Sequence, residues 1–180
     1  MESSKSKKEL IGWGKSLLIA AAIAVVIRTF LFAPYVVEGA SMEPTLHNHE
    51  KIFVNKMYYS NNINRGDIVI IKGQTENYVK RIIGTPGDKI EMNDDHLLIN
   101  GEPYKESYLS ENRMAAEDMG IQLTGDFGPV VVPANHYFVM GDNRLRSMDS
   151  RNGLDFIKKK DIIGKSEFVI FPFSNIREVK

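Results

Sequence analysis

The most constraining feature of the sequence is an uncharged apolar run close to its beginning. Leu17 to Ile27 carries no charged or amide side chain, and apolar residues dominate on both sides of it. A helix needs about 20 residues to cross the roughly 30 Å hydrocarbon core of a bilayer. Trp13–Ala33 is long enough if Lys15 and Arg28 extend toward opposite interfaces. We therefore predict a transmembrane helix over 13–34, ended by a proline.

Basic residues are in excess before Pro34, and acidic residues are in excess after it. Five of the 23 basic and two of the 23 acidic residues precede Pro34, so 18 basic residues face 21 acidic ones after it. Lysines before a span predict a cytoplasmic N-terminus. We expect a basic cytoplasmic tail over 1–12 and an extracytoplasmic domain over 35–180. The formal net charge of zero argues against an overall electrostatic affinity for nucleic acid.

A cleaved secretory signal peptide has the same order of basic and apolar regions and stays open as an alternative. Its cleavage site needs small residues at −3 and −1, and cleavage after Ala40 would put Glu38 at −3. Both readings place the rest of the chain across the membrane.

The part after Pro34 has the pattern of an antiparallel, mostly-β domain. Short β-rich runs alternate with Gly, Pro, Asn and Asp turns, and Asn100-Gly101 is a type I′ hairpin signal. A helical period is suggested only at 110–119 and 156–161, and a polar insertion covers roughly 93–129. The runs that we predict as strands are 51–54, 67–72, 78–83, 89–92, 97–99, 130–132, 137–140 and 167–171.

Several kinds of site are poorly supported. The chain has no cysteine, which excludes thiol nucleophiles, thiolate metal sites and disulfides. His47 and His49 form the one histidine cluster, but they lack the spacing of helical zinc sites and are read as a polar loop. Gly84–Gly87 lacks the Gly-Lys-Ser/Thr of a phosphate cradle and is read as a turn. We expect no metal and no cofactor.

A serine and a lysine are the stronger candidates. Ser41 lies just beyond the predicted span. Pro44, three residues later, prevents Ser41 from starting a helix through a capping box in the usual way. Lys80 lies inside the strand-like run 78–83, and the period of two puts it on the same face as Tyr78 and Ile82. Burial on such a face would lower the pKa of the lysine, and a neutral amine can act as a general base for a hydroxyl. A turn serine and a surface lysine remain the alternatives.

A third cluster follows the predicted strand 137–140. The loop from Gly141 to Arg151 holds two aspartates, three arginines and two serines. Ser147 could orient a neutral lysine through a hydrogen bond, and the aspartates and arginines could pair as a scaffold. A solvated turn is the alternative.

Taken together, these motifs resemble the type I signal peptidases, in the short form with a single span found in Gram-positive bacteria. Any single motif is weak, but their order behind one span is specific. The resemblance covers nearly the whole chain and rests on Ser41-Met42-x-Pro44-Thr45, Arg65-Gly66-Asp67-Ile68-Val69, Tyr78-Val79-Lys80-Arg81-x-x-Gly84-x-Pro86-Gly87-Asp88 and Gly141-Asp142-Asn143-Arg144-x-x-Ser147-x-Asp149-Ser150-Arg151.

The resemblance implies a Ser/Lys endopeptidase that removes signal peptides with small residues at −3 and −1. Ser41 would be the nucleophile, Lys80 the general base, and Ser147 the group that positions the Lys80 amine. Met42 would line the pocket or a membrane-facing surface. Asp142, Arg144, Asp149 and Arg151 would hold the last motif together, with Arg81 beside the base as a further supporting residue.

The same resemblance describes a monomer in the cell membrane whose partners are preprotein signal peptides and membrane lipid, with no nucleic acid. An extended peptide would add to an exposed sheet edge. One departure concerns Gly39, where some members of the family carry a serine that helps to form the oxyanion hole. The hole would then depend mainly on the backbone around Ser41, in the region of Gly39, Met42 and Pro44.

Three other functions remain open. A soluble Ser/Lys autoprotease would carry a DNA-binding helix–turn–helix and no span. A β-lactamase-like acyl enzyme needs Ser-x-x-Lys on a helix, where this chain has Pro44. A membrane-anchored binding module would need neither Ser41 nor Lys80.

Overall fold

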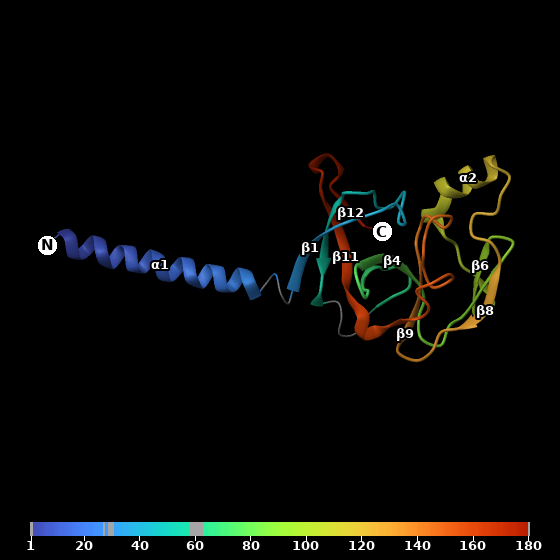
Figure 1. The fold of residues 1–180 in the computed structure, drawn as a ribbon, viewed down its shortest axis with the longest axis horizontal. Coiled ribbons are helices and arrows are strands. Elements are labelled where there is room, and N and C mark those ends of the chain that lie inside the picture. Colours follow the sequence, from blue (N-terminus) through green and yellow to red (C-terminus); the bar gives the residue numbers. More distant parts are fainter. Residues whose placement is uncertain (1, 27, 29–30, 58–62, 180) are drawn as a thin grey trace.

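The protein consists of an N-terminal helix followed by a β-rich body (Figure 1). The computed structural model describes residues 2–26, 28, 31–57 and 63–179, with side chains described from residue 12 onward. Helix α1 is Glu2–Val26 and extends away from the body. The side chains of most of the predicted basic tail, and residues 27, 29 and 30 of the predicted span, lie outside the described part. Within that part, no helix has both the length and the apolar content that a membrane crossing requires.

The predicted helix over 13–34 is wrong at its C-terminal end. Helix α1 ends at Val26, and Phe32–Val36 forms strand β1, which pairs antiparallel with β2, Lys51–Asn55. The ring of Phe32 stacks on that of Phe53 with 4.9 Å between centroids. Apolar content alone could not separate helix from strand here, because the pairing partner lies about twenty residues further on.

The main sheet is antiparallel throughout and confirms the predicted mostly-β domain. Its strand order is β1-β2-β11-β3-β4-β9-β10, with β12 paired to β11. The strands are β3 Ile68–Lys72, β4 Asn77–Gly84, β9 His136–Met140, β10 Ile157–Lys158, β11 Ile162–Phe171 and β12 Arg177–Glu178.

Several predicted boundaries in the main sheet need correction. β11 begins at Ile162, five residues before the predicted strand 167–171. The helical period suggested for 156–161 is wrong, since β10 and the 3-10 turn η4, Lys159–Asp161, occupy that stretch. A second short 3-10 turn, η5 (Phe173–Asn175), follows β11.

A second sheet of order β7-β6-β5-β8 lies beside the main sheet. Its strands are β5 Lys89–Asn93, β6 His96–Ile99, β7 Glu102–Pro103 and β8 Phe127–Val131, and η3 Ser107–Leu109 leads into α2, Ser110–Asp118. The predicted insertion at 93–129 covers β6, β7, α2 and part of β8, while most of β5 lies before it. The predicted α2 and the Asn100-Gly101 turn are confirmed, and both turn residues have positive φ.

Four groups of buried apolar residues hold the described part of the body together, the smallest being Leu109, Ala116 and Leu123 around α2. One lies under β1, β2 and β11 and includes Met42 and Leu46. A second joins β3, β4, β9 and β11, and a third joins the two sheets through residues such as Ile90 and Phe138. The segment that carries Ser41 is thus packed into the first group.

Candidate active site

Ser41 lies in a short turn after β1 whose other residues are fixed to the core. Met42 and Leu46 are buried, and the Leu46 amide donates to the Met42 carbonyl at 3.0 Å. The Asn143 amide donates to the Ser41 carbonyl at 3.0 Å. Of the two roles predicted for Met42, the structure agrees with the first, since Met42 lines the cavity beside Ser41. A membrane-facing role does not fit, because the side chain is 1% exposed and packs in the core.

Lys80 points at this serine. It lies in β4, is 3% exposed, and its Nζ donates a hydrogen bond of 2.7 Å to Ser41 Oγ. Burial lowers the pKa of Lys80 from 10.5 to about 8, although the charges of Asp149, Asp142 and Glu76 act in the opposite direction. A substantial fraction of the amine is therefore neutral near physiological pH, as a general base requires.

A cavity of about 240 Å³ opens in front of this pair. Its walls are formed by the segment from Tyr35 to Glu38, by Ser41 and Met42, and by the segment from Glu76 to Lys80. The register of β4 with β9 includes only Arg81, Ile82 and Gly84, so residues 77–80 have no strand partner on that side among the described strands. The outer edge of β1 is likewise unpaired in the described part of the chain. Two free strand edges thus border the cavity.

Arg81, next to Lys80, forms a buried ion pair with Asp142. Its Nε and Nη2 donate to the two carboxylate oxygens at 2.8 and 2.6 Å, and its Nη1 donates to the Gly66 carbonyl. The Thr45 hydroxyl donates to the same carboxylate. Asp142 is 0% exposed and Arg81 is 2% exposed. The pair therefore joins the serine turn, β4 and the loop after β9.

The predicted pairing inside the last motif holds in part. Arg151 makes a bidentate pair with Asp149 at 2.9 Å, and its hydrogen bonds and charge outweigh burial and lower the pKa of that carboxyl. Arg144, however, pairs with Glu106 and not with an aspartate of its own loop. Glu106 belongs to the second sheet region, by which we mean β5 to β8 with η3 and α2 between them. Its Nε donates to the Gly141 carbonyl, which keeps that loop close to the dyad.

Ser147 is buried but does not make the predicted hydrogen bond to the Lys80 amine. Among the described residues its Oγ has no hydrogen-bond partner, and so no hydrogen bond to Lys80. The hydroxyl helps to lower the pKa of Asp149 without reaching hydrogen-bond geometry. A Cβ at Gly141 would collide with Ser147 and with the Ser41 carbonyl. Glycine at 141 therefore lets the two serine segments approach each other.

The other residues predicted near the oxyanion region do not line the cavity. Gly39 has a φ of +85°, and its amide donates to Asn48 Oδ1 at 2.9 Å. Pro44 lies in the turn after Ser41. Within the described residues, no acceptor takes the Ser41 amide hydrogen.

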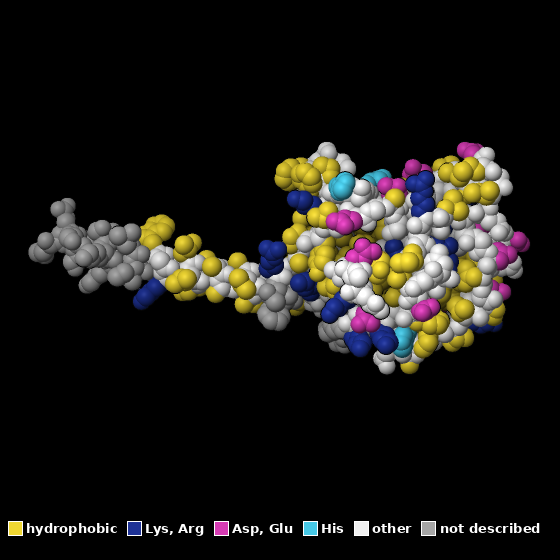
Figure 2. All heavy atoms as spheres, in the orientation of Figure 1, with side chains coloured by type: hydrophobic (Ala, Val, Ile, Leu, Met, Phe, Trp, Pro, Cys, Tyr) yellow, Lys and Arg dark blue, Asp and Glu magenta, His cyan; other side chains and the backbone are white. Residues whose placement is uncertain are grey.

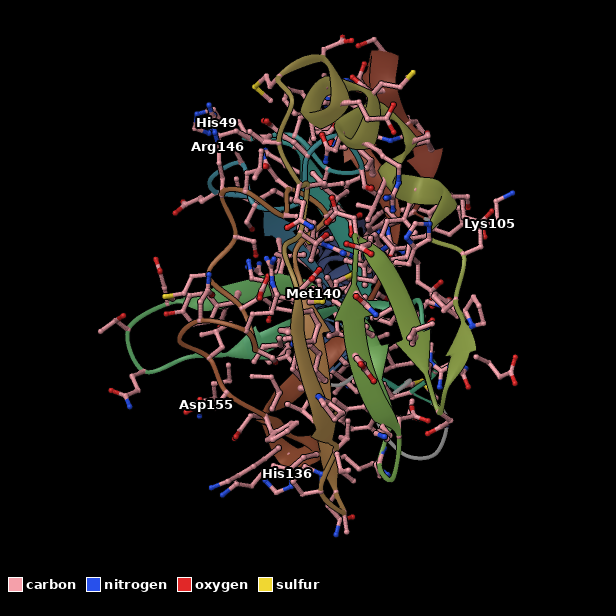
Figure 3. All side chains as sticks on the ribbon, turned by 90° about the vertical axis from the view of Figure 1, so that its right-hand side faces the viewer. His49, Lys105, His136, Met140, Arg146 and Asp155 are labelled. Carbon is pink, nitrogen blue, oxygen red and sulfur yellow. The ribbon has the colours of Figure 1, made fainter. Side chains whose placement is uncertain are left out.

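The histidine loop is tied into the structure by other groups. Glu50 accepts two hydrogen bonds from Arg177 at 2.8 Å and one from the His47 amide. His49 and His136 lie at opposite ends of the body in Figure 3, which also labels Met140 near its centre, just before the loop at 141. Among the described residues no group of three or more His, Asp or Glu side chains could hold a metal ion.

Sequence reasoning missed the contribution of the second sheet region. Glu106 pairs with Arg144, and the Tyr108 ring lies 3.9 Å from the Arg81 guanidinium. Asn112 of α2 donates to two backbone carbonyls beside the dyad. No motif marks these residues, and their partners lie 27 or more positions away in the chain. The loop from Gly141 to Arg151 has three arginines but only two aspartates, and this excess of basic residues is the signal that could have indicated a carboxylate elsewhere in the chain.

Comparison with known proteins now decides the family. Residues 10–171 match the family model described as "Signal peptidase, peptidase S26". The chain belongs to this signal peptidase family. It is 57% identical over 179 residues to "Signal peptidase I P" of Bacillus subtilis subsp. natto, covering 98% of this chain and 96% of that one. It is 55% identical to "Signal peptidase I T" of Bacillus subtilis strain 168, covering 99% and 94% of the two chains.

A solved signal peptidase has the same fold. The crystal structure of a signal peptidase I from Enterococcus faecalis V583 matches with a TM-score of 0.54 and 34% identity, over 58% of this chain and 97% of that one. The mostly-β body is therefore the fold of a signal peptidase, as the resemblance in the sequence indicated.

Proposed function

We propose that Ser41 and Lys80 are the catalytic pair with which this signal peptidase, a serine endopeptidase of the S26 family, cleaves signal peptides. The observation that carries the proposal is the 2.7 Å hydrogen bond between Lys80 Nζ and Ser41 Oγ. It lies at the wall of a cavity that is bordered by two free strand edges. A buried amine with a lowered pKa beside an accessible hydroxyl is the arrangement that activates a serine nucleophile.

The reaction then proceeds through an acyl-enzyme. Neutral Lys80 takes the Ser41 proton as Oγ attacks the carbonyl carbon at the end of the signal peptide. The resulting ammonium gives that proton to the leaving amine as the peptide bond breaks. Lys80 then takes a proton from a water molecule, which attacks the ester carbonyl. As the bond to Ser41 Oγ breaks, the Lys80 ammonium returns this proton to Oγ, and both residues regain their starting state.

The oxyanion is stabilised by the free amide of Ser41. A single oxyanion-hole donor contributes about 3 kcal/mol to transition-state stabilisation in another hydrolase. Gly39 carries no hydroxyl, so it cannot supply a second side-chain donor. Its own amide is already engaged by Asn48.

The substrate is an extended peptide that adds as a strand between β1 and the first half of β4. Main-chain hydrogen bonds to a free edge provide affinity, and pockets for alternate side chains provide specificity. The small size of the cavity, about 240 Å³, favours small side chains at −1 and −3. Both dyad residues come from one chain, so a monomer suffices.

Membrane attachment would place the enzyme where its substrates are. Residues 12–26 of α1 carry exposed apolar side chains, including Trp13 at 78% and Leu17 at 74%, and Figure 2 shows them along the helix. Phe171 and Phe173 are exposed on the body. We assign both regions to contact with lipid, with α1 as the anchor, its N-terminus in the cytoplasm and the body outside. Confinement to one interface raises the effective concentration of a membrane-bound signal peptide.

The decisive experiment is cleavage of a preprotein in detergent by the wild type and by Ser41→Ala and Lys80→Ala. We expect correct processing by the wild type and none by either variant, with the folded state of each checked by circular dichroism. Cleavage retained in a folded variant would reject the dyad.

A further inference from the structure

We propose that Asn112, on helix α2, is a positioning residue that holds the serine turn against the loop after β9. The proposal rests on the proposed function, because it concerns the geometry of the Ser41–Lys80 pair. It gives the second sheet region a part in the reaction, although none of its residues lines the cavity.

The primary observation is that one side-chain amide bridges two loops. Asn112 Nδ2 donates to the Glu43 carbonyl at 3.0 Å and to the Asp142 carbonyl at 2.9 Å. Glu43 lies two residues after Ser41, and Asp142 directly follows Gly141. The two acceptors are 99 residues apart in the sequence, so the amide fixes a contact that the chain itself does not enforce.

Both bridged loops act on the dyad. The Asp142 carboxylate binds Arg81, the neighbour of Lys80 on β4, and also accepts from Thr45 in the serine turn. The Asn143 amide holds the Ser41 carbonyl. Removing the Asn112 amide leaves the partly buried Glu43 carbonyl with no donor among the described residues, whereas the Asp142 carbonyl keeps the Arg144 amide at 3.0 Å. The bridge between the two loops is lost, which lets the serine turn move relative to β4.

Helix α2 is itself held firmly enough to act as a support. Arg113, the next residue, donates to the Asp95 carbonyl, and the Asp95 carboxylate accepts the amides of Leu123, Thr124 and Gly125. Before the helix, the Tyr108 ring stacks on Arg81. The region therefore contacts β4 through Tyr108, and it contacts the serine turn and the loop after β9 through Asn112.

The test is the kinetics of preprotein cleavage by the full chain in detergent for Asn112→Ala, with Met114→Ala as the matched control. Met114 lies on the same helix, where its side chain is 59% exposed. We expect kcat to fall about 100-fold in Asn112→Ala with KM nearly unchanged, because a misplacement of about 1 Å can cost that much. The control should keep the wild-type rate.

A second readout separates positioning from stability. Water entering between the serine turn and β4 would raise the apparent pKa in the kcat/KM profile, although the charges that act on Lys80, from Asp149, Asp142 and Glu76, are unchanged. All rates are measured well below the melting temperature of each variant. If Asn112→Ala does not fold, Asn112→Ser serves the same test, because its side chain is too short to reach both carbonyls.

A folded variant with wild-type kcat and apparent pKa would overturn the proposal, as would a loss of rate that follows the unfolded fraction alone. Failure of the proposed function would look different. In that case the wild type would not process the preprotein, or Ser41→Ala would process it, whatever residue occupies position 112.

Discussion

The pH dependence of cleavage is the sharpest test of the Lys80 assignment. Burial lowers the pKa of Lys80 from 10.5 to about 8. At pH 8 about half of the amine would then be neutral, against roughly 0.3% for an unperturbed lysine, which is a gain of about 160-fold in the reactive form. We expect kcat/KM for a preprotein to rise with pH and to level off above an apparent pKa near 8.

Neighbouring charge should move this value in a predictable direction. The Glu76 carboxylate raises the pKa of Lys80, so Glu76→Gln should lower the apparent pKa. The change should be small because Glu76 is exposed and its charge is screened by solvent. A matched exposed carboxylate at a distance, Glu117, gives the control Glu117→Gln, for which we expect no change.

The same pKa has a consequence for stability. Between pH 8 and 10.5 the unfolded lysine is protonated while the native one is neutral, so the unfolded state binds more protons and stability rises with pH. Relative to Lys80→Met, the wild type should gain about 3 kcal/mol in free energy of unfolding across this window. A wild-type rate profile centred near 10.5, together with no pH-dependent difference between the two proteins, would refute a buried, largely neutral Lys80.

Three further changes address the residues around the pair. Arg81→Met leaves the fully buried Asp142 carboxylate without its ion-pair partner, and urea denaturation should report a loss of about 3–5 kcal/mol. Thr45→Val removes a hydroxyl donor to the same carboxylate and should cost about 1.5–3 kcal/mol in that assay. Gly141→Ala places a methyl group against the Ser41 carbonyl, so we expect kcat to fall about 100-fold. Unchanged kinetics would mean that the loop can shift to accommodate the methyl group without displacing Ser41.

The sequence predicted those parts of the site that local pattern can encode. The period of two in 78–83 placed Lys80 on one face with Tyr78 and Ile82 and left a surface lysine open as the alternative, and the fold buries Lys80. The resemblance supplied the pairing of Ser41 with Lys80, which the 2.7 Å hydrogen bond supports. The alternation also suggested that Arg81 faces away from Lys80, but it could not indicate that this second face is buried as well.

The remaining parts depend on contacts between distant residues. Asp142 pairs with Arg81 across 61 positions and Arg144 with Glu106 across 38, and no local spacing distinguishes these partners from others in the loop. The predicted helix extends over residues 32–34 of strand Phe32–Val36 because their apolar side chains continue the preceding run, whereas the pairing with β2 decides their conformation.

The free strand edges beside the dyad also affect how copies of this protein meet one another. An unpaired edge that can receive a substrate strand can equally receive the edge of a second molecule. Glu38 and Glu76 line this opening, are exposed, and have no ion-pair partner among the described residues. Two copies meeting edge to edge would bring these carboxylates together, and like charges at a strand edge oppose such pairing. If the enzyme is concentrated at a membrane surface, as proposed above, these two carboxylates would oppose aggregation through the groove that receives the substrate.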